Sequence, residues 1–183
     1  MRPLAVSTII ATIGLFLGHN RICTAAPSQW QFPRGTTAVV TGGTSGIGKA
    51  VVEELASFAG VRVLTCARNS DALDQKLRDW SEKGWDCAGV VADVSTQEGR
   101  DVFVEAIREW LGDDEQLDIL VNNVGTNIRK PSVKYSGSDI DHVWKTNFES
   151  MFGLTVACHD MLRRDSDAET TSSVVNIGSV AGE

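Results

Sequence analysis

Residues 36–50, with the sequence TTAVVTGGTSGIGKA, carry the strongest indication of the fold. The first six residues are a short apolar, β-branched run, which is typical of a buried strand. A glycine-rich turn follows directly, and apolar residues at helical spacing then continue from residue 46 to about residue 58. A strand, a glycine turn and a helix in immediate succession predict the first βα unit of an open α/β sheet.

The glycines of this turn have three separate tasks in such a unit. Gly42 permits a tight turn, Gly46 lets backbone N–H groups approach a diphosphate, and Gly48 lets the helix pack closely on the strand. The positive end of the helix then faces the phosphates. A turn that binds nothing is the alternative, but its place after the first strand favours a dinucleotide site. The predicted phosphate-binding residues are Gly42, Thr44, Ser45, Gly46, Ile47 and Gly48.

The rest of the chain repeats the alternation of strand and helix. Apolar runs at 61–66, 86–93, 117–123 and 172–178 predict four more strands, and helical spacing at 71–83, 95–111 and 138–164 predicts helices between them. Ser95 and Glu98 fit a capping box at the start of the helix over 95–111. Strands separated by helices imply right-handed βαβ crossovers. We therefore predict an α/β fold with a Rossmann-type, doubly wound parallel sheet.

The segment at the end of the second strand, TCARNS, distinguishes between two dinucleotides. NAD-preferring sites have an acidic residue there, which accepts hydrogen bonds from the ribose hydroxyls. In this chain Ala67 stands at that position and Arg68 follows it. A guanidinium can pair with a 2′-phosphate that a carboxylate would repel, so the segment favours NADP over NAD. A solvated loop cation is the alternative interpretation of Arg68.

Two further strand ends are predicted to reach the same crevice, because parallel strands end at one edge of a sheet. Asp93 can accept a hydrogen bond from the adenine amino group, and Val94 can pack against the ring. Asn122 and Asn123 end the fourth apolar run and Gly125 follows it; Asn122 and Gly125 are the predicted cofactor contacts among them. Strand ends rich in asparagine are also ordinary turn chemistry, so only their position favours a ligand.

The composition excludes several classes of protein. The 183 residues are 42% hydrophobic and 22% charged, as in soluble globular proteins, and the net charge is −7. The sequence has no Lys/Arg cluster, so nucleic acid and anionic membrane surfaces are poor candidate partners. The four cysteines show neither a CxxC pair nor zinc-ligand spacing, so no metal site and no disulfide framework are predicted. Cys66 and Cys87 lie in apolar runs and are expected to be buried thiols.

The first 26 residues stand apart from this pattern. A basic start at Arg2, an apolar run over 4–18 and small residues at 24–26 are typical of a secretory or endomembrane signal. A bipartite organelle presequence fits equally well, and a permanent anchor is second choice because the run is short for a membrane span. We expect residues 1–26 to direct the protein to the secretory pathway, endomembranes or an organelle rather than the cytoplasm. Residues 27–35 are then a connector to a dinucleotide-binding domain over 36–183.

Together these motifs resemble those of the short-chain dehydrogenase/reductase family. TGGTSGIG matches the family's glycine-rich turn, ADV its adenine contact and NNVG its NNAG motif. Asn147 in WKTNFES and Ser179 in NIGSVAG match the family's helix asparagine and active-site serine. Within the family, TCARN and NNVGTNIRKPSVKYS are most similar to the tropinone-reductase-like branch. The resemblance extends from about residue 34 to residue 183.

The resemblance implies NADPH-dependent reduction of a small ketone or aldehyde, or the reverse oxidation of an alcohol. It implies that Ser179 orients the carbonyl oxygen and that Asn147 helps to hold a water-linked proton relay. The residue types alone favour a turn-capping hydroxyl at Ser179 and a buried amide at Asn147. A full-length form of the protein is a candidate homo-oligomer.

Two features depart from the family's pattern. Val124 replaces the alanine of NNAG, which adds bulk beside the crevice. The family's proton donor is a tyrosine in a YxxxK motif after the serine, but the one tyrosine here, Tyr135, precedes Ser179 and has Asp139 four residues on. We therefore expect a C-terminally truncated domain, incomplete after the fifth strand, that lacks a roughly 100-fold to 10,000-fold contribution from general acid catalysis. A catalytically inactive dinucleotide-binding module or regulatory partner is the alternative function.

Overall fold

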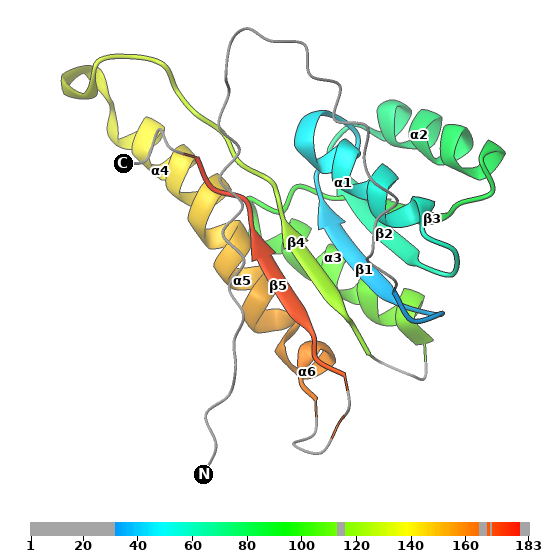
Figure 1. Ribbon diagram of the computed structural model, residues 1–183. Coiled ribbons are helices and arrows are strands. Elements are labelled where there is room, and N and C mark those ends of the chain that lie inside the picture. The colour runs from blue at the N-terminus through cyan, green and yellow to red at the C-terminus, as the bar shows by residue number, and fades with distance from the viewer. Residues whose placement is uncertain (1–31, 113–115, 165–167, 169, 180–183) are drawn as a thin grey trace, which may run out of the picture.

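The strand that opens residues 36–50, β1 (Thr37–Thr41), lies in the middle of a five-stranded parallel sheet in the computed structural model (Figure 1). The structure describes residues 32–112, 116–164, 168 and 170–179. The strand order is β3-β2-β1-β4-β5. The other strands are β2 (Arg62–Ala67), β3 (Asp86–Val91), β4 (Ile119–Asn122) and β5 (Ser173–Asn176). The predicted α/β fold with a doubly wound parallel sheet is confirmed.

Helices cover both faces of this sheet (Figure 1). α1 (Gly46–Ser57) and α2 (Ser70–Glu82) pack on one face, and α3 (Gln97–Leu111), α5 (Ser150–Ala157) and α6 (His159–Leu162) pack on the other. Side chains of β1 alternate between the two layers, with Val39 in the α3–α5 core and Ala38 and Val40 in the α1–α2 core. All of β1 is buried, because both its edges are paired and both faces are covered.

Each core contains a large, fully buried aromatic side chain. Trp80 of α2 and Phe103 of α3 are both 0% exposed. The indole of Trp80 keeps a polar partner, because its Nε1 donates to Glu53 Oε1 at 3.2 Å. Burial of each such side chain contributes roughly 1.5–3 kcal/mol, so the two layers hold the strands, and therefore the strand ends, in place.

The predicted start of the helix over 95–111 is wrong. The N-cap of α3 is Thr96, whose hydroxyl accepts from the N–H of Gly99 at 3.0 Å, and not Ser95. The hydroxyl of Ser95 instead donates to Asp93 Oδ1 at 2.7 Å. The helix therefore begins one residue later than predicted, and the predicted Ser95–Glu98 capping box does not form.

The region predicted to be helical over 138–164 is helical along most of its length, but it is not one regular helix. α4 (Gly137–Trp144) passes into a π-helical turn, η3 (Lys145–Glu149), which passes into α5, and α6 starts after Cys158. A π-helical turn accommodates an extra residue and rotates the side chains on either side of it relative to each other. The apolar periodicity of the sequence does not reveal that rotation.

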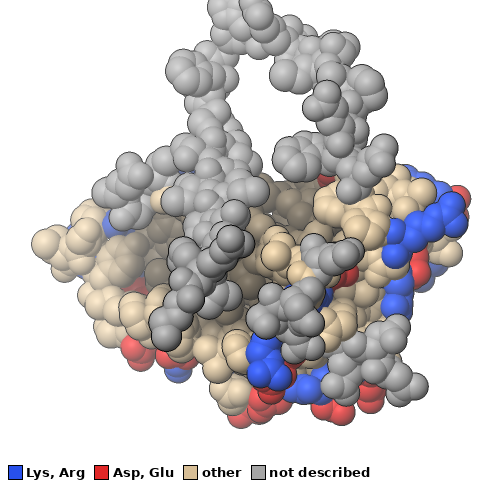
Figure 2. All heavy atoms as spheres, turned by 60° about the horizontal axis from the view of Figure 1, so that its bottom comes forward, with Lys and Arg blue, Asp and Glu red and all other residues tan. Residues whose placement is uncertain are grey.

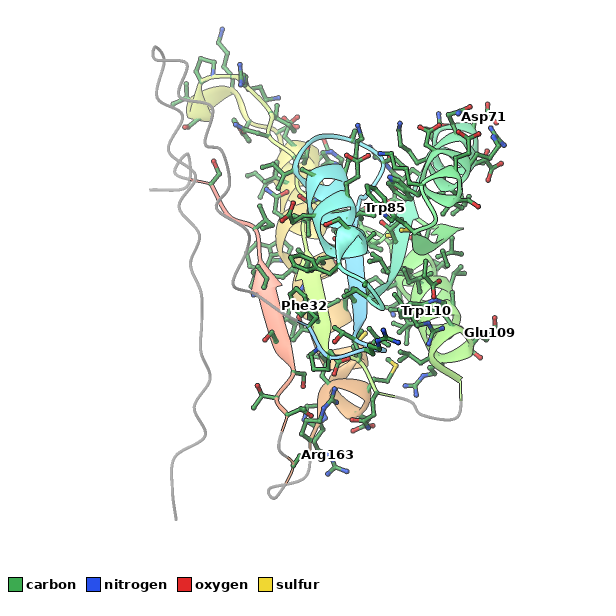
Figure 3. All side chains as sticks on the ribbon, turned by 45° about the vertical axis from the view of Figure 1, so that its right-hand side comes forward. Phe32, Asp71, Trp85, Glu109, Trp110 and Arg163 are labelled. Atoms are coloured by element: carbon green, nitrogen blue, oxygen red, sulfur yellow. The ribbon has the colours of Figure 1, made fainter. Side chains whose placement is uncertain are left out.

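The predicted targeting segment, residues 1–26, lies outside the described residues and stays a prediction. The described end of the connector packs on the α1 face, where Phe32 stands edge-on to Phe58 with ring centroids 5.0 Å apart (Figure 3). Every helix in the described part of the chain is too short or too polar to cross a membrane. On the face shown in Figure 2, acidic and basic side chains are interspersed along the lower edge.

Candidate functional site: a crevice at the strand ends

A cavity of about 420 Å³ opens at the carboxyl ends of β1, β2, β3 and β4. Its walls come from the glycine-rich turn, the residues that follow β2, β3 and β4, and one side of α4 and η3. The chain leaves β1 toward the α1 face and leaves β4 toward the α5 face, so the crevice opens where the connections diverge. Such a switch point is where open α/β sheets bind their ligands.

The glycine-rich turn has the conformation predicted from its sequence. Gly42 and Gly46 have φ of +72° and +55°, a region that strongly favours glycine. A Cβ at Gly48 would lie 2.3 Å from both Asn123 Nδ2 and Gly42 O, so only glycine lets α1 approach the turn this closely. Among the predicted residues, Gly42, Thr44, Ser45 and Ile47 line the cavity, whereas Gly46 and Gly48 shape the turn without lining it.

The N-terminus of α1 differs from those of α2, α3 and α4. Ser45 precedes α1 with an extended backbone, and its hydroxyl makes no capping hydrogen bond. By contrast, α2, α3 and α4 are capped by the side chains of Asn69, Thr96 and Ser136. The first amides of a helix lack intrahelical acceptors. At α1 no side chain caps these amides, and Ser45 and Ile47 line the cavity, where the helix dipole favours negative charge.

The two adjacent asparagines at the end of β4 have different surroundings. Asn122 is buried and does not line the cavity. Its Nδ2 donates to Asn176 Oδ1 at 2.9 Å and to Thr155 Oγ1 at 3.1 Å, so it joins β4 to β5 and α5. Successive strand residues point to opposite faces, which explains why the structure places Asn122 away from the crevice and Asn123 beside it.

Asn123 and Thr41 together hold the loop after β4 against the end of β1. Asn123 Nδ2 donates to Thr41 O at 2.9 Å. The hydroxyl of Thr41 accepts from the N–H groups of Asn123 and Val124, at 2.9 and 3.0 Å. The departure from the family pattern at Val124 is accommodated, since this side chain lines the cavity and contacts the α3–α5 core.

The end of β2 brings a cation to the cavity without an acidic residue beside it. Ala67 and Arg68 both line the cavity. Within the described residues, Arg68 has no carboxylate at ion-pair distance. Asp93 also lines the cavity. Burial alone would raise the pKa of its carboxyl group, but hydrogen bonds from Ser95 and the nearby positive groups of Arg68 and His142 lower this pKa. The cavity therefore contains one carboxylate and a guanidinium that is open to an anion.

The turn after β3 places Asp93 and Val94 at the cavity. Hydrogen bonds from Ser95 and Arg100 hold this turn in place. Asp93 Oδ1 accepts from the N–H of Ser95 at 3.0 Å, and Arg100 Nη1 donates to Val94 O at 3.1 Å. Arg100 is only 8% exposed, although it is charged. A Cβ at Gly99 would lie 2.0 Å from Asp93 O, so the start of α3 touches the turn directly.

Asn147 lies in η3 and binds the loop after β4 rather than its own helix. Its Oδ1 accepts from the N–H of Thr126 at 2.7 Å, and its Nδ2 donates to Thr126 O at 2.9 Å. Gly125 and Thr126 line the cavity, and Asn147 supports them without lining it. The amide is therefore neither buried nor bonded to helix backbone, in contrast to what its residue type alone suggests. π-helical turns are frequent at functional sites, and this one places the Asn147 amide at the crevice wall.

Ser179 lies shortly beyond β5, at the same edge of the sheet as the crevice. β5 pairs with β4, and the N–H of Ile177 donates to Asn122 O at 2.9 Å, which carries the chain toward that edge. Ser179 is exposed and does not line the cavity formed by the described residues.

Two other side chains with reactive groups have structural surroundings. The hydroxyl of Tyr135 donates to Ile128 O, and the Lys130 ammonium lies 5.4 Å from its ring centroid, so Tyr135 secures its own loop. Cys66 lines the cavity but is 1% exposed, and burial raises the pKa of its thiol to about 12. A neutral buried thiol is an apolar wall and not a nucleophile.

Residues from α4 and η3 were missed by sequence reasoning. His142 and Thr146 both line the cavity. Their i, i+4 spacing puts them on one helix face, which is a detectable signal. That signal could not be used from sequence alone, because nothing local says which face of the helix is turned toward the crevice.

The sheet order, the glycine-rich turn and the crevice define this chain as a nucleotide-binding α/β domain of the Rossmann type. The family model for the short chain dehydrogenase matches residues 36–183. The chain belongs to the short-chain dehydrogenase family.

Curated relatives place the chain in the tropinone-reductase-like branch. A tropinone reductase homologue from Arabidopsis thaliana is 46% identical over 149 residues, which cover 81% of this chain and 53% of the relative. A homologue from Datura stramonium is 40% identical over 154 residues, which cover 84% of this chain and 54% of the relative. The chain thus spans about half the length of the curated relatives it matches.

Solved structures similar to this chain support the fold. The RhlG/NADP active-site complex from Pseudomonas aeruginosa has a TM-score of 0.72 and 38% identity, over 81% of this chain and 56% of that one. L-sorbose reductase from Gluconobacter frateurii, complexed with NADPH and L-sorbose, has a TM-score of 0.65 and 32% identity, over 70% and 48%.

Proposed function

We propose that this chain is the cofactor-binding part of an NADP(H)-dependent oxidoreductase that interconverts a ketone or aldehyde with the corresponding alcohol. The observation that carries the proposal is the combination of an uncapped α1 N-terminus with the open guanidinium of Arg68 in one cavity. Ala67 stands where NAD sites place an acidic residue, so a 2′-phosphate meets a cation and no adjacent carboxylate. The complexes of two relatives with NADP and NADPH support the same cofactor.

The residues present fit the adenosine and diphosphate parts of such a cofactor. The amides at the start of α1 would hold the diphosphate, and Arg68 would hold the 2′-phosphate. Asp93 keeps Oδ2 for the adenine amino group, since the hydrogen bonds from Ser95 go to Oδ1. Val94 is fixed by Arg100 and would pack on the ring. The cavity volume of about 420 Å³ lies in the range of ordinary ligand sites.

In the proposed reaction, the carbonyl carbon takes a hydride that bound NADPH would supply, and the carbonyl oxygen takes a proton, which leaves the alcohol and NADP⁺. Ser179 would donate a hydrogen bond to the carbonyl oxygen. Asn147 would keep the loop at Thr126 in place beside the reacting groups. The single tyrosine of these residues, Tyr135, is engaged with Ile128, so the family's proton donor has no counterpart among the 183 residues. We expect cofactor binding with little turnover.

A calorimetric titration of the 183-residue chain with NADPH and with NADH tests the proposal, combined with a turnover assay on a panel of ketones and aldehydes. Tighter binding of NADPH supports it. Slow but measurable turnover excludes the alternative of an inactive dinucleotide-binding module for these residues, whereas binding with no detectable turnover favours it. If neither dinucleotide binds, the assignment of the cavity is wrong.

A further inference from the structure

Thr65 of β2 lies directly behind the glycine-rich turn and is fully buried, with 0% of its surface exposed. Its hydroxyl donates to Val40 O at 2.6 Å and accepts from the N–H of Gly43 at 3.0 Å. One hydroxyl thus joins the end of β1 to the second glycine of the turn. Both bonds are buried, where they are not weakened by competition with water.

Gly43 packs so closely against this hydroxyl that no side chain fits at its position. A Cβ at Gly43 would lie 2.2 Å from Thr65 Oγ1 and 2.8 Å from Val52 Cγ2. Unlike Gly42, Gly43 does not have a positive φ, so space and not backbone conformation requires the glycine. The missing side chain and the threonine hydroxyl are therefore complementary.

The position of Gly43 matters because its two neighbours face the ligand. Gly42 and Thr44 line the cavity, and Gly43 lies between them without lining it. If the hydroxyl of Thr65 were removed, the N–H of Gly43 would lose its acceptor in a buried place, which is unfavourable. The turn would then shift toward another acceptor, and the cavity wall would shift with it.

We propose that Thr65 is a positioning residue for the cofactor, which holds Gly43 and thereby sets the glycine-rich turn in the geometry that receives the diphosphate. Thr65 does not line the cavity, so it acts through the turn. The inference rests on the proposed binding of NADP(H). In the sequence, Thr65 looks like any other β-branched residue of a buried strand, and its role follows only from its hydrogen bonds.

The test is Thr65→Val, which keeps the shape of the side chain and removes the hydroxyl. The chain offers a matched control in Thr37→Val. Thr37 is 6% exposed, and its hydroxyl also bridges a carbonyl and an N–H, donating to Gln116 O at 2.8 Å and accepting from Asp118 N at 3.1 Å. It lies at the other end of the sheet, away from the cavity. Thr65→Ser restores the hydroxyl without the methyl group.

We expect Thr65→Val to raise the Kd for NADPH about tenfold, which corresponds to about 1.4 kcal/mol, and Thr37→Val to change it less than about twofold. Both valine variants should lower the Tm by similar amounts, and Thr65→Ser should recover most of the affinity. Hydrogen exchange of the cofactor-free chain gives a second readout, because the amides over 41–46 should exchange faster in Thr65→Val only.

Equal affinities of the two valine variants for NADPH, or unchanged exchange over 41–46, would overturn the inference. If the wild-type chain binds no NADPH, the proposed function fails, but the exchange measurement still decides whether Thr65 holds the turn. If Thr65→Val does not fold, Gly43→Ala perturbs the same contact from the turn and should weaken NADPH binding at least as much.

Discussion

Replacing Arg68 by methionine tests the basis of cofactor choice, because it removes the charge and keeps most of the length of the side chain. Arg68 lines the cavity at the end of β2, and no carboxylate of the described residues holds it in an ion pair. Asp93 lies in the same cavity with a lowered pKa and stays charged in the variant. The variant would then lack the cation that faces the 2′-phosphate, while the negative charge of Asp93 stays elsewhere in the cavity.

The magnitude follows from the exposure of Arg68 and the chemistry of its contact. A hydrogen bond between charged groups contributes about 1.5–3 kcal/mol. Arg68 is exposed at the rim, where solvent screens the charge, so we expect the lower end of that range. A loss of about 1.5 kcal/mol raises the Kd for NADPH roughly tenfold. NADH has no 2′-phosphate, so its Kd should change less than about twofold.

The assay is calorimetric titration of both dinucleotides at low and at high salt. Arg78→Met is the matched control, since Arg78 is an exposed residue of α2 and its loss changes the net charge equally. High salt should weaken NADPH binding to the wild type more than to Arg68→Met. The reasoning is refuted if NADPH and NADH lose affinity equally in Arg68→Met, or if the control behaves in the same way.

Two other changes have clear expected outcomes. Gly48→Ala places a Cβ 2.3 Å from Asn123 Nδ2, so α1 must move away from the turn. It should abolish measurable NADPH binding and lower the Tm, and a variant with normal calorimetric titration would contradict the packing argument. Hydrogen bonds from Lys130 and Ser136 hold the pKa of Asp139 well below its ordinary value of 3.8, so its stabilising effect is present above that pH and is lost in acid. Asp139→Asn should therefore lower the Tm at neutral pH, and its difference from wild type should shrink as the pH falls; pH-independent curves would argue against the ion pair.

Much of the candidate site could be predicted because its requirements are local. Positive φ at Gly42 and Gly46 needs glycine wherever the turn occurs, and the turn is recognisable because it directly follows an apolar strand. Arg68 and Asp93 could be placed at the crevice because parallel strands end at one edge. The sequence analysis chose Asn122 as a cofactor contact, whereas the structure puts Asn123 at the cavity, because a shift of one residue in the strand end exchanges their faces.

The amino-acid sequence by itself determined the order of strands and helices, the glycine-rich turn and the charge at the end of β2, since these depend on periodicity and on residues adjacent in the chain. Tertiary structure alone decided which side chains hold that turn. Thr65 and Gly43 are 22 positions apart, and their hydrogen bond exists only because β2 pairs in register with β1. Asn147 reaches Thr126 only because the fold brings η3 beside the loop after β4. Contacts of this kind form only when the strands pair in the folded sheet, and no local sequence pattern encodes them.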